Sequence, residues 1–581
     1  MDADRKNSVD VVYTDGEIII DANGPPAQAV FIKAGRIAAV GSNEDVLAAA
    51  GSGVSCSSLN GATVIPGLID THPHLLHFAA FKGSLLDIAD AKNHEEIIEA
   101  IRRKAEQTPH GSWIMTSPVG ELHWFHRRSY RDLEEGNLPD RHILDLASAN
   151  HPIMIHALAP KDPNVCAFNT AALKILGIGR STPDRVNDVW IEKDDEGHPT
   201  GILRGSVTNY YNNDPFFMSL LNKMPPLIQE DVVPAALAQA MKDYNALGIT
   251  TIYEGHAMDF PHIGAYQAFR AQNLLSVRVQ TCPELQPGAF PTDGKKTIAE
   301  INSTLEKALS LRELQDDWLR IEGITACTYG PCYTGCALVK DGYLSPSGET
   351  TTGKRGISED NLRAAFEFCA KRGLRLNLCS VSEDEHDDHF AMAVEVMEKY
   401  GLKQTGWLLQ HGMIIRPDQI KRLAELGFDM TVSTAFTFGE AEIYEKRIGS
   451  GVLENVNPFR LLLDAGLSVA ASMDWGPTNP FEQMQLAITH RMYPSGRSNA
   501  GPAQVVNRAE AYEMWTRHGA KVLGWHDIGS ISRGNHADLA ILDRNPITCD
   551  LDALPSTRVL RTLIGGLVVY DNGDLPAASQ V

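Results

Sequence analysis

The stretch Val64-Ile65-Pro66-Gly67-Leu68-Ile69-Asp70-Thr71-His72-Pro73-His74 decides how the rest of the chain is interpreted. An apolar run ends in Asp70, and two histidines follow with a single residue between them. Side chains alternate between the faces of an extended strand, so we expect His72 and His74 to point the same way. Two adjacent imidazoles at a strand end form half of a site for a divalent metal. Such a pair also arises by chance or on a surface, so the rest of the chain must supply the other half.

Composition and charge exclude several classes of partner. The chain has 581 residues, of which 43% are hydrophobic and 22% charged, as is typical of a large globular protein. A formal net charge of −21 argues against nucleic acid and anionic membranes as partners. No apolar run approaches the length of about 18 residues that a spanning helix needs. Nine scattered cysteines without a Cys-x-x-Cys pair do not form a disulfide framework, so we expect a cytoplasmic protein.

Both ends of the chain are predicted to be β-rich. Residues 9–65 contain short apolar runs separated by turn signals such as Asp15-Gly16 and Asn23-Gly24. Residues 537–570 repeat this pattern. We therefore expect one discontinuous β domain that is built from residues 1–65 and 528–581.

Between these ends the chain alternates strands and helices. Helices are predicted at residues 94–107, 231–247, 359–372 and 417–426. Strands are predicted at residues 152–156, 248–253, 319–321, 374–378, 430–432 and 467–471. Repeated β-then-α units over this length favour the α/β class, and within it a (β/α)8 barrel over residues 66–527 with an insertion around residues 85–235. In such a barrel the chemistry lies at the C-terminal ends of the strands, where His72 and His74 are found.

Three other predicted strand ends carry candidate ligands. Glu254 and His256 follow the strand at residues 248–253 and are expected to share a face, although a polar loop explains them equally well. His411 ends the apolar run 406–410 ahead of a helix that Pro417 opens, which favours a metal ligand over a core histidine. Asp474 ends the run 467–473, where an acid is costly unless it is paired, metal-bound or catalytic. A helix N-cap is the alternative for Asp474, but a metal ligand that also accepts a proton from attacking water fits better.

Taken together, these motifs resemble the amidohydrolase superfamily, and specifically its amidohydrolase-3 branch, which includes formamide deformylase-like enzymes. The similarity extends over nearly the whole chain. Its main motifs are residues 64–74, 169–173, 197–203, 410–411, 473–477 and 529–539. The resemblance implies a metal-bearing barrel with an inserted subdomain, a β-sandwich made from both chain ends, and attack of metal-activated water on an amide-like carbon.

The resemblance also implies a ligand set, which this chain matches in part. The family uses a His-x-His pair, a carboxylated lysine, two further histidines and an aspartate. His72, His74, His411 and Asp474 match four of these positions. Thr325 stands where the bridging lysine is expected, and Cys379 where the first single histidine is expected. We therefore expect one zinc ion rather than two.

Three further residues, Cys379, Glu254 and His256, are candidates for additional metal ligands, and we call them the reserve ligands. Cys379 is either a thiolate ligand, which suits zinc, or an inert buried thiol. Glu254 and His256 are the other reserve ligands. The charged run at residues 383–389 is expected to begin a solvated helix.

The expected activity is hydrolysis of a C–N bond in an amide, formamide or cyclic amide. A metal-dependent lyase or decarboxylase on the same scaffold, and a degenerate binding protein without activity, are the alternatives. The stretch Glu121-Leu122-His123-Trp124-Phe125-His126 suggests a pocket for a small, partly apolar substrate. The oligomeric state is left open, with a homodimer as one expectation because large barrel enzymes often pair.

Overall fold

The computed structural model describes residues 10–120, 128–157, 164–209, 212, 214–286, 295–576 and 579–580. The stretch 121–126, which the sequence assigns to a pocket wall, lies outside these residues. Within them, no helix combines the length and apolar character that crossing a membrane requires.

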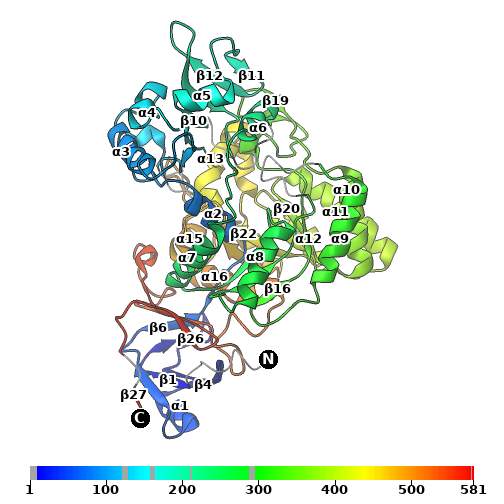
Figure 1. Cartoon of the computed structure of the whole chain (residues 1–581). Coiled ribbons are helices and arrows are strands. Elements are labelled where there is room, and N and C mark those ends of the chain that lie inside the picture. Colours follow the sequence, from blue (N-terminus) through cyan, green and yellow to red (C-terminus); the bar gives the residue numbers. More distant parts are fainter. Residues whose placement is uncertain are drawn as a thin grey trace.

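Two parallel sheets form the centre of the molecule (Figure 1). One has the strand order β16-β15-β14-β7 and the other the order β17-β20-β21-β22-β23, and every pairing in both is parallel. The strands are β7 (Leu68–Asp70), β14 (Ile249–Glu254), β15 (Arg278–Thr281), β16 (Leu319–Ile321), β17 (Ile324–Cys327), β20 (Leu376–Ser380), β21 (Leu408–His411), β22 (Asp429–Ser433) and β23 (Val469–Ser472).

Hydrogen bonds link the two sheets at both of their edges. On one side β16 leads almost directly into β17, and an isolated parallel bridge joins Glu284 to Thr325. On the other side the N–H and hydroxyl of Thr71 donate to the carbonyl of Ala471 over 3.3 and 2.8 Å. Among the described residues no paired ladder joins β23 to β7, so a closed barrel stays a prediction.

Helices follow the central strands in alternation, as the sequence predicts. They are α2 (Leu75–Ser84), α7 (Val233–Ala246), α8 (Phe260–Ala271), α9 (Ile298–Leu311), α10 (Glu359–Arg372), α11 (Glu383–Tyr400), α12 (Pro417–Leu426), α13 (Phe436–Ile448), α14 (Phe459–Asp464), α15 (Pro480–Thr489), α16 (Arg508–Met514) and α17 (Arg517–Leu523). Helix α10 shows why the bounds were predictable: Ser358 caps its first turn through Asn361 N, and Gly373 ends it with φ of 65°. One large apolar cluster packs most of these helices on the strands.

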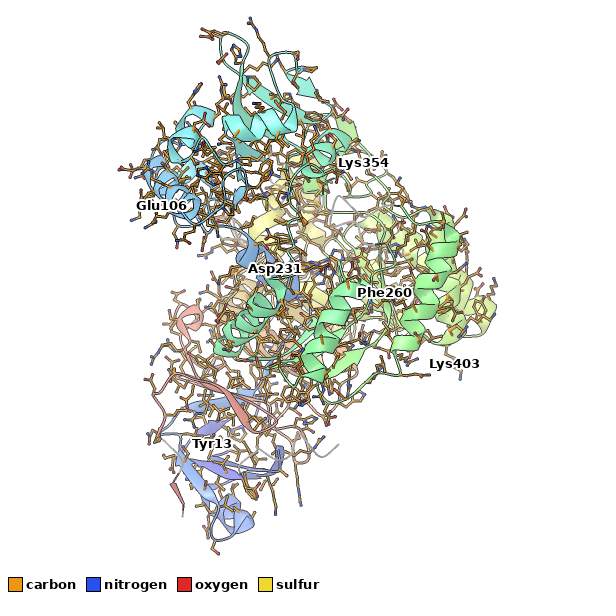
Figure 2. All side chains as sticks on the ribbon, viewed as in Figure 1. Tyr13, Glu106, Asp231, Phe260, Lys354 and Lys403 are labelled. Carbon is orange, nitrogen blue, oxygen red and sulfur yellow. The ribbon has the colours of Figure 1, made fainter. Side chains whose placement is uncertain are left out.

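The two chain ends together build two further five-stranded sheets, at the bottom of Figure 1. One has the order β27-β5-β1-β3-β4 and the other β2-β6-β24-β25-β26. The strands are β1 (Val11–Thr14), β2 (Glu17–Ile18), β3 (Ala29–Lys33), β4 (Arg36–Gly41), β5 (Ser55–Ser58), β6 (Thr63–Pro66), β24 (Leu539–Leu542), β25 (Val559–Ile564), β26 (Leu567–Asp571) and β27 (Ser579–Gln580). Both sheets contribute to one apolar cluster, which includes Tyr13, Ile32, Ile541 and Leu563. Figure 2 shows Tyr13 in this part of the molecule.

A third unit is inserted between β7 and β14. Its six-stranded sheet has the order β11-β12-β13-β10-β9-β8 and lies with α3, α4 and α5 in the upper part of Figure 1, where Figure 2 marks Glu106. The elements are β8 (Ile114–Thr116), β9 (Ile153–Ile155), β10 (Val165–Phe168), β11 (Arg185–Val186), β12 (Val189–Lys193), β13 (Pro199–Gly205), α3 (His94–Ala105), α4 (Arg141–Ala147) and α5 (Thr170–Leu176). Two apolar clusters of its own fill this unit.

A buried ion pair ties the terminal sheets to the central ones. The guanidinium of Arg278, the first residue of β15, donates through Nε and Nη2 to the Asp538 carboxylate over 2.6 and 2.9 Å. Asp538 directly precedes β24 and also accepts a hydrogen bond from Gly565 N. Both side chains are almost completely buried, so each charge depends on the other.

Removing the carboxylate should therefore destabilise the whole fold. Asp538→Ala leaves the Arg278 guanidinium buried without its partner, and we expect the free energy of unfolding to fall by about 3–5 kcal/mol. Urea denaturation measures this loss. Glu395→Ala, which removes the exposed ion pair with Arg363, is the control and should change stability little. Equal effects in the two variants would contradict the structural role of the pair.

Candidate metal centre

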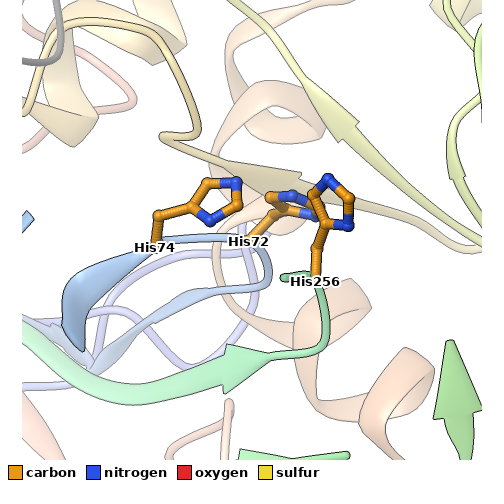
Figure 3. Close-up of side chains that lie close together, drawn as sticks. All are labelled: His72, His74 and His256. Carbon is orange, nitrogen blue, oxygen red and sulfur yellow. The ribbon is translucent and has the colours of Figure 1, made fainter. Parts of the chain in front are cut away.

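His72 and His74 lie in a turn after β7 and not on the strand itself. The strand ends at Asp70, whose Oδ1 accepts a hydrogen bond from His72 N over 3.1 Å. This Asx-type turn stops the extended run, so the prediction that strand alternation aligns the two histidines is wrong. His74 instead precedes α2 in a left-handed conformation, with φ of 50°. Figure 3 shows the two rings on the same side of the turn all the same, together with His256 from the loop after β14.

Asp70 also fixes this turn against the end of β23. Its Oδ1 accepts a second hydrogen bond from Met473 N over 3.1 Å, and Asp474 N donates to the His72 carbonyl over 3.0 Å. Burial raises the pKa of Asp70 to about 7, although these backbone donors oppose the shift. These hydrogen bonds hold the histidine turn and the end of β23 together as one unit, although Asp70 and Met473 are 403 residues apart in the sequence.

His411 and Asp474 complete the group at the ends of β21 and β23. The Asp474 carboxylate lies 3.5 Å from His74 Nε2 and 3.4 Å from His411 Nδ1. Burial by itself raises the pKa of Asp474, but the imidazoles of His72, His74 and His411 outweigh it and hold the pKa below its usual value. Both His411 and Asp474 have left-handed backbones, with φ of 70° and 42°. Backbone strain of this kind collects at functional sites, because the surrounding structure must enforce it.

The histidine rings converge on one point. The ring centre of His72 lies 4.9 Å from that of His74, 4.7 Å from His411 and 5.4 Å from His256. Two sets of three potential ligands have all their ligand atoms within 4.8 Å of one another. These sets are His72 with His74 and His256, and His72 with His411 and Asp474.

The unsatisfied atoms of this cluster fit a divalent metal. Both ring nitrogens of His72 and both carboxylate oxygens of Asp474 are buried without a hydrogen-bond partner. Burial lowers the pKa of His72 well below its usual value and that of His411 to about 4, so both rings are neutral at physiological pH. Neutral imidazole and carboxylate are the ligands that zinc takes in proteins. A metal would satisfy atoms that are otherwise costly to bury.

Of the reserve ligands, the structure brings His256 into the cluster but not Glu254. His256 Nδ1 lies 3.0 Å from Glu284 Oε2, which leaves Nε2 as the nitrogen that can bind a metal. Burial opposes protonation of His256, but Glu284 outweighs it and raises the pKa. Glu254 Oε1 instead accepts hydrogen bonds from Leu76 N and Tyr266 Oη, over 2.9 and 2.8 Å. Glu254 thereby holds the start of α2, and it belongs to none of the ligand sets among the described residues.

Cys379 also lies beside the cluster, and a second cysteine, Cys327, is next to it. Cys327 and Cys379 pair directly across β17 and β20, and with His256 they form a third set with ligand atoms within 4.8 Å of one another. Thr325, two residues before Cys327, belongs to none of these sets: its hydroxyl donates to the Gly255 carbonyl and contacts Cys282 Sγ. Sequence reasoning missed Cys327 and Glu284. Alternation from Thr325 would have shown Cys327 on the same strand face, but Glu284 gives no comparable signal.

Several of these residues line one cavity of about 490 Å³. Its wall includes His74, His256, Cys327, Cys379, His411 and Asp474. Aromatic side chains, namely Tyr333, Phe436, Tyr444 and Trp475, line other parts of it. Lys354, marked in Figure 2, also belongs to the wall. A cavity of this size suits a small molecule that has an apolar portion.

Comparisons with known proteins agree with this fold. A model of the amidohydrolase family matches residues 57–570. The chain is 27% identical to the N-substituted formamide deformylase of Arthrobacter pascens, over 95% of this chain and 96% of that protein. Crystal structures of uncharacterized metal-dependent hydrolases are also similar. The one from Pyrococcus horikoshii has a TM-score of 0.69 at 20% identity, covering 94% of this chain and 99% of that one. The one from Pyrococcus furiosus has 0.66 at 19%, covering 93% and 100%.

The fold, the cluster of buried histidines around Asp474 and the family match together identify the class of protein. The chain belongs to the amidohydrolase family, since the family match covers most of its length. The similarity to the amidohydrolase-3 branch that the sequence predicts is thereby confirmed.

Proposed function

We propose that this protein is a metal-dependent hydrolase that cleaves a C–N bond of a small, partly apolar amide or formamide. One observation carries the proposal: His72, His74, His256, His411 and Asp474 converge beside the cavity, and the buried ligand atoms of His72 and Asp474 have no hydrogen-bond partner. The similarity to a formamide deformylase over nearly the whole chain supports the type of bond. The metal that we propose is zinc, held by His72, His74, His411 and Asp474.

The proposed architecture follows the family resemblance. The two central sheets and their helices would form a (β/α)8 barrel over residues 66–527, with the insertion around residues 85–235. The two terminal sheets would form a β-sandwich from residues 1–65 and 528–581. The order of the strands and the hydrogen bonds at both sheet edges support the barrel.

Asp474 has the central chemical role in this proposal. When bound, zinc lowers the pKa of water and polarises a carbonyl group. The Asp474 carboxylate, which its histidine neighbours keep ionised, accepts the proton of the attacking water at Oδ1 or Oδ2. It then passes this proton to the leaving nitrogen as the C–N bond breaks, so that one amide and one water give one acid and one amine. His72 and His411 contribute as neutral rings that keep their lone pairs available.

A product assay tests this function. The purified protein, loaded with zinc, is incubated with N-substituted formamides, linear amides and cyclic amides that carry aromatic or aliphatic groups. We expect turnover of at least one of these classes, with equal amounts of amine and acid from a formamide or linear amide, or a single ring-opened product with both groups from a cyclic amide. Release of carbon dioxide without amine would show a lyase instead. No turnover in any class by zinc-loaded protein would contradict the proposed C–N hydrolase.

Glu284 should tune metal binding by His256, which lies beside the four proposed ligands of the first zinc and has Nε2 available for a metal. The hydrogen bond from His256 Nδ1 to a carboxylate makes the opposite nitrogen a stronger ligand, and loss of such a partner typically costs about 10–100-fold in metal affinity. In Glu284→Gln the amide oxygen can still accept from Nδ1, so we expect zinc affinity to fall by about 10-fold, at the lower end of that range. Competition with a chromophoric chelator measures the affinity. Unchanged affinity would show that His256 does not bind the metal.

A further inference from the structure

A second cluster of ligand atoms lies beside the first, at the ends of neighbouring strands. Cys327 ends β17 and Cys379 lies near the end of β20, and the two residues are in register across the parallel pair. His256 reaches them from the loop after β14. One imidazole nitrogen and two sulfur atoms thus lie within 4.8 Å of one another.

From this geometry we propose that His256, Cys327 and Cys379 form a second, thiolate-containing site for a zinc-type metal ion. The inference deepens the proposed function and rests on it only for the first metal, for which His72, His411 and Asp474 form a separate set of ligand atoms. A tetrahedral zinc with Zn–S bonds of about 2.3 Å places two sulfurs about 3.8 Å apart, within the observed spacing. Two thiolates and an imidazole suit zinc and exclude magnesium or calcium, which prefer oxygen ligands.

The surroundings of the three residues agree with a metal site. Glu284 fixes the orientation of the His256 ring, in the carboxylate–histidine–metal arrangement that accompanies many zinc ligands. The same carboxylate accepts a hydrogen bond from Ala257 N over 2.6 Å, so it is itself held in place. Cys327 and Cys379 both line the cavity, which leaves a fourth position of the metal open toward a substrate.

The site explains the two departures from the family ligand set. Cys379 stands where a histidine is expected, and a thiolate replaces an imidazole there without loss of a ligand. Thr325 donates its hydroxyl to the Gly255 carbonyl and cannot bridge, whereas Cys327, two residues later on the same strand, places its sulfur atom within 4.8 Å of ligand atoms of His256 and Cys379. Each of the two departures, Thr325 in place of the lysine and Cys379 in place of the histidine, would by itself weaken a two-metal centre. With Cys327 beside them, they leave a different set of ligands for a second metal.

Metal content and the spectrum of the cobalt-substituted protein test this inference. We expect two zinc ions per wild-type chain, and one in the double variant Cys327→Ser with Cys379→Ser. Cobalt-loaded wild type should show a thiolate-to-cobalt charge-transfer band in the near ultraviolet, which the double variant lacks. Cys56→Ser, a half-buried cysteine of β5, is the matched control and should keep both the band and two metals.

The outcomes separate this inference from the proposed function. One metal per wild-type chain and no thiolate band would overturn the second site alone, and metal-free protein that takes up no zinc would overturn both. Formation of a disulfide between Cys327 and Cys379 in metal-loaded protein, detected by thiol titration, would also overturn it. If the double variant does not fold, Cys379→His serves instead: it should keep two metals with a weaker charge-transfer band, and an unchanged band would contradict the assignment.

Discussion

Asp474→Asn is expected to lower the rate of hydrolysis by about 10²–10⁴-fold, the usual contribution of a positioned proton acceptor. Asparagine has nearly the same shape, but it cannot take a proton from the attacking water. The change should appear in kcat, because the cavity that binds the substrate is otherwise unaltered. Steady-state kinetics on the substrate found in the product assay measures the effect.

The protein should still fold and still bind the first zinc after this substitution. His72, His74 and His411 remain in place as ligands in Asp474→Asn, so the first zinc should still bind, although less tightly. Asp418→Asn, which alters an exposed carboxylate at the start of α12, is the control and should keep full activity. Wild-type kcat in the Asp474 variant would contradict the role assigned to this carboxylate.

His72→Ala should have the largest effect on metal binding. His72 belongs to two of the three ligand sets, and its ring centre lies 4.9 Å from that of His74 and 4.7 Å from that of His411. Loss of the hydrogen-bond partner of a metal-bound histidine costs about 10–100-fold in metal affinity. We therefore expect loss of the ligand itself to cost more than 100-fold. Chelator competition followed by mass-spectrometric metal analysis measures this loss.

A second histidine variant shows whether removing an imidazole anywhere in the protein lowers zinc affinity. His142 is an exposed residue of α4 in the inserted unit, far along the chain from the cluster. His142→Ala should keep wild-type zinc affinity and activity. If His72→Ala retained wild-type affinity as well, the first metal site would have to be assigned elsewhere.

The sequence was sufficient to predict which strand ends bring candidate ligands together. His411 and Asp474 each end an apolar run, and the parallel sheets bring those ends to the same edge. The helices α10 and α12 have the predicted bounds, since clear start signals and glycine at the C-terminal end define them. What local patterns could not supply is the backbone after each strand. The turn at Asp70, for example, replaces the expected strand as the segment that carries His72 and His74.

Long-range packing accounts for the other differences. The run at residues 383–389 does begin a helix, α11, but Glu385, His386 and His389 are buried and not solvated. Glu385 accepts a hydrogen bond from Tyr329 N over 3.2 Å, and His389 Nε2 lies 2.9 Å from Thr328 Oγ1. These contacts hold the loop after β17 against the cavity. Because the partners are more than 50 residues away, no local pattern of charges indicates them.

Metal analysis of the unmodified protein tests the central claim most directly. The protein is stripped with a chelator, dialysed against zinc and analysed by mass spectrometry for metal per chain. The convergence of four histidines and Asp474 predicts at least one tightly bound zinc ion, whose removal abolishes hydrolysis and whose return restores it. Protein that binds no zinc after this treatment, or that hydrolyses its substrate equally well without it, would contradict a metal-dependent hydrolase.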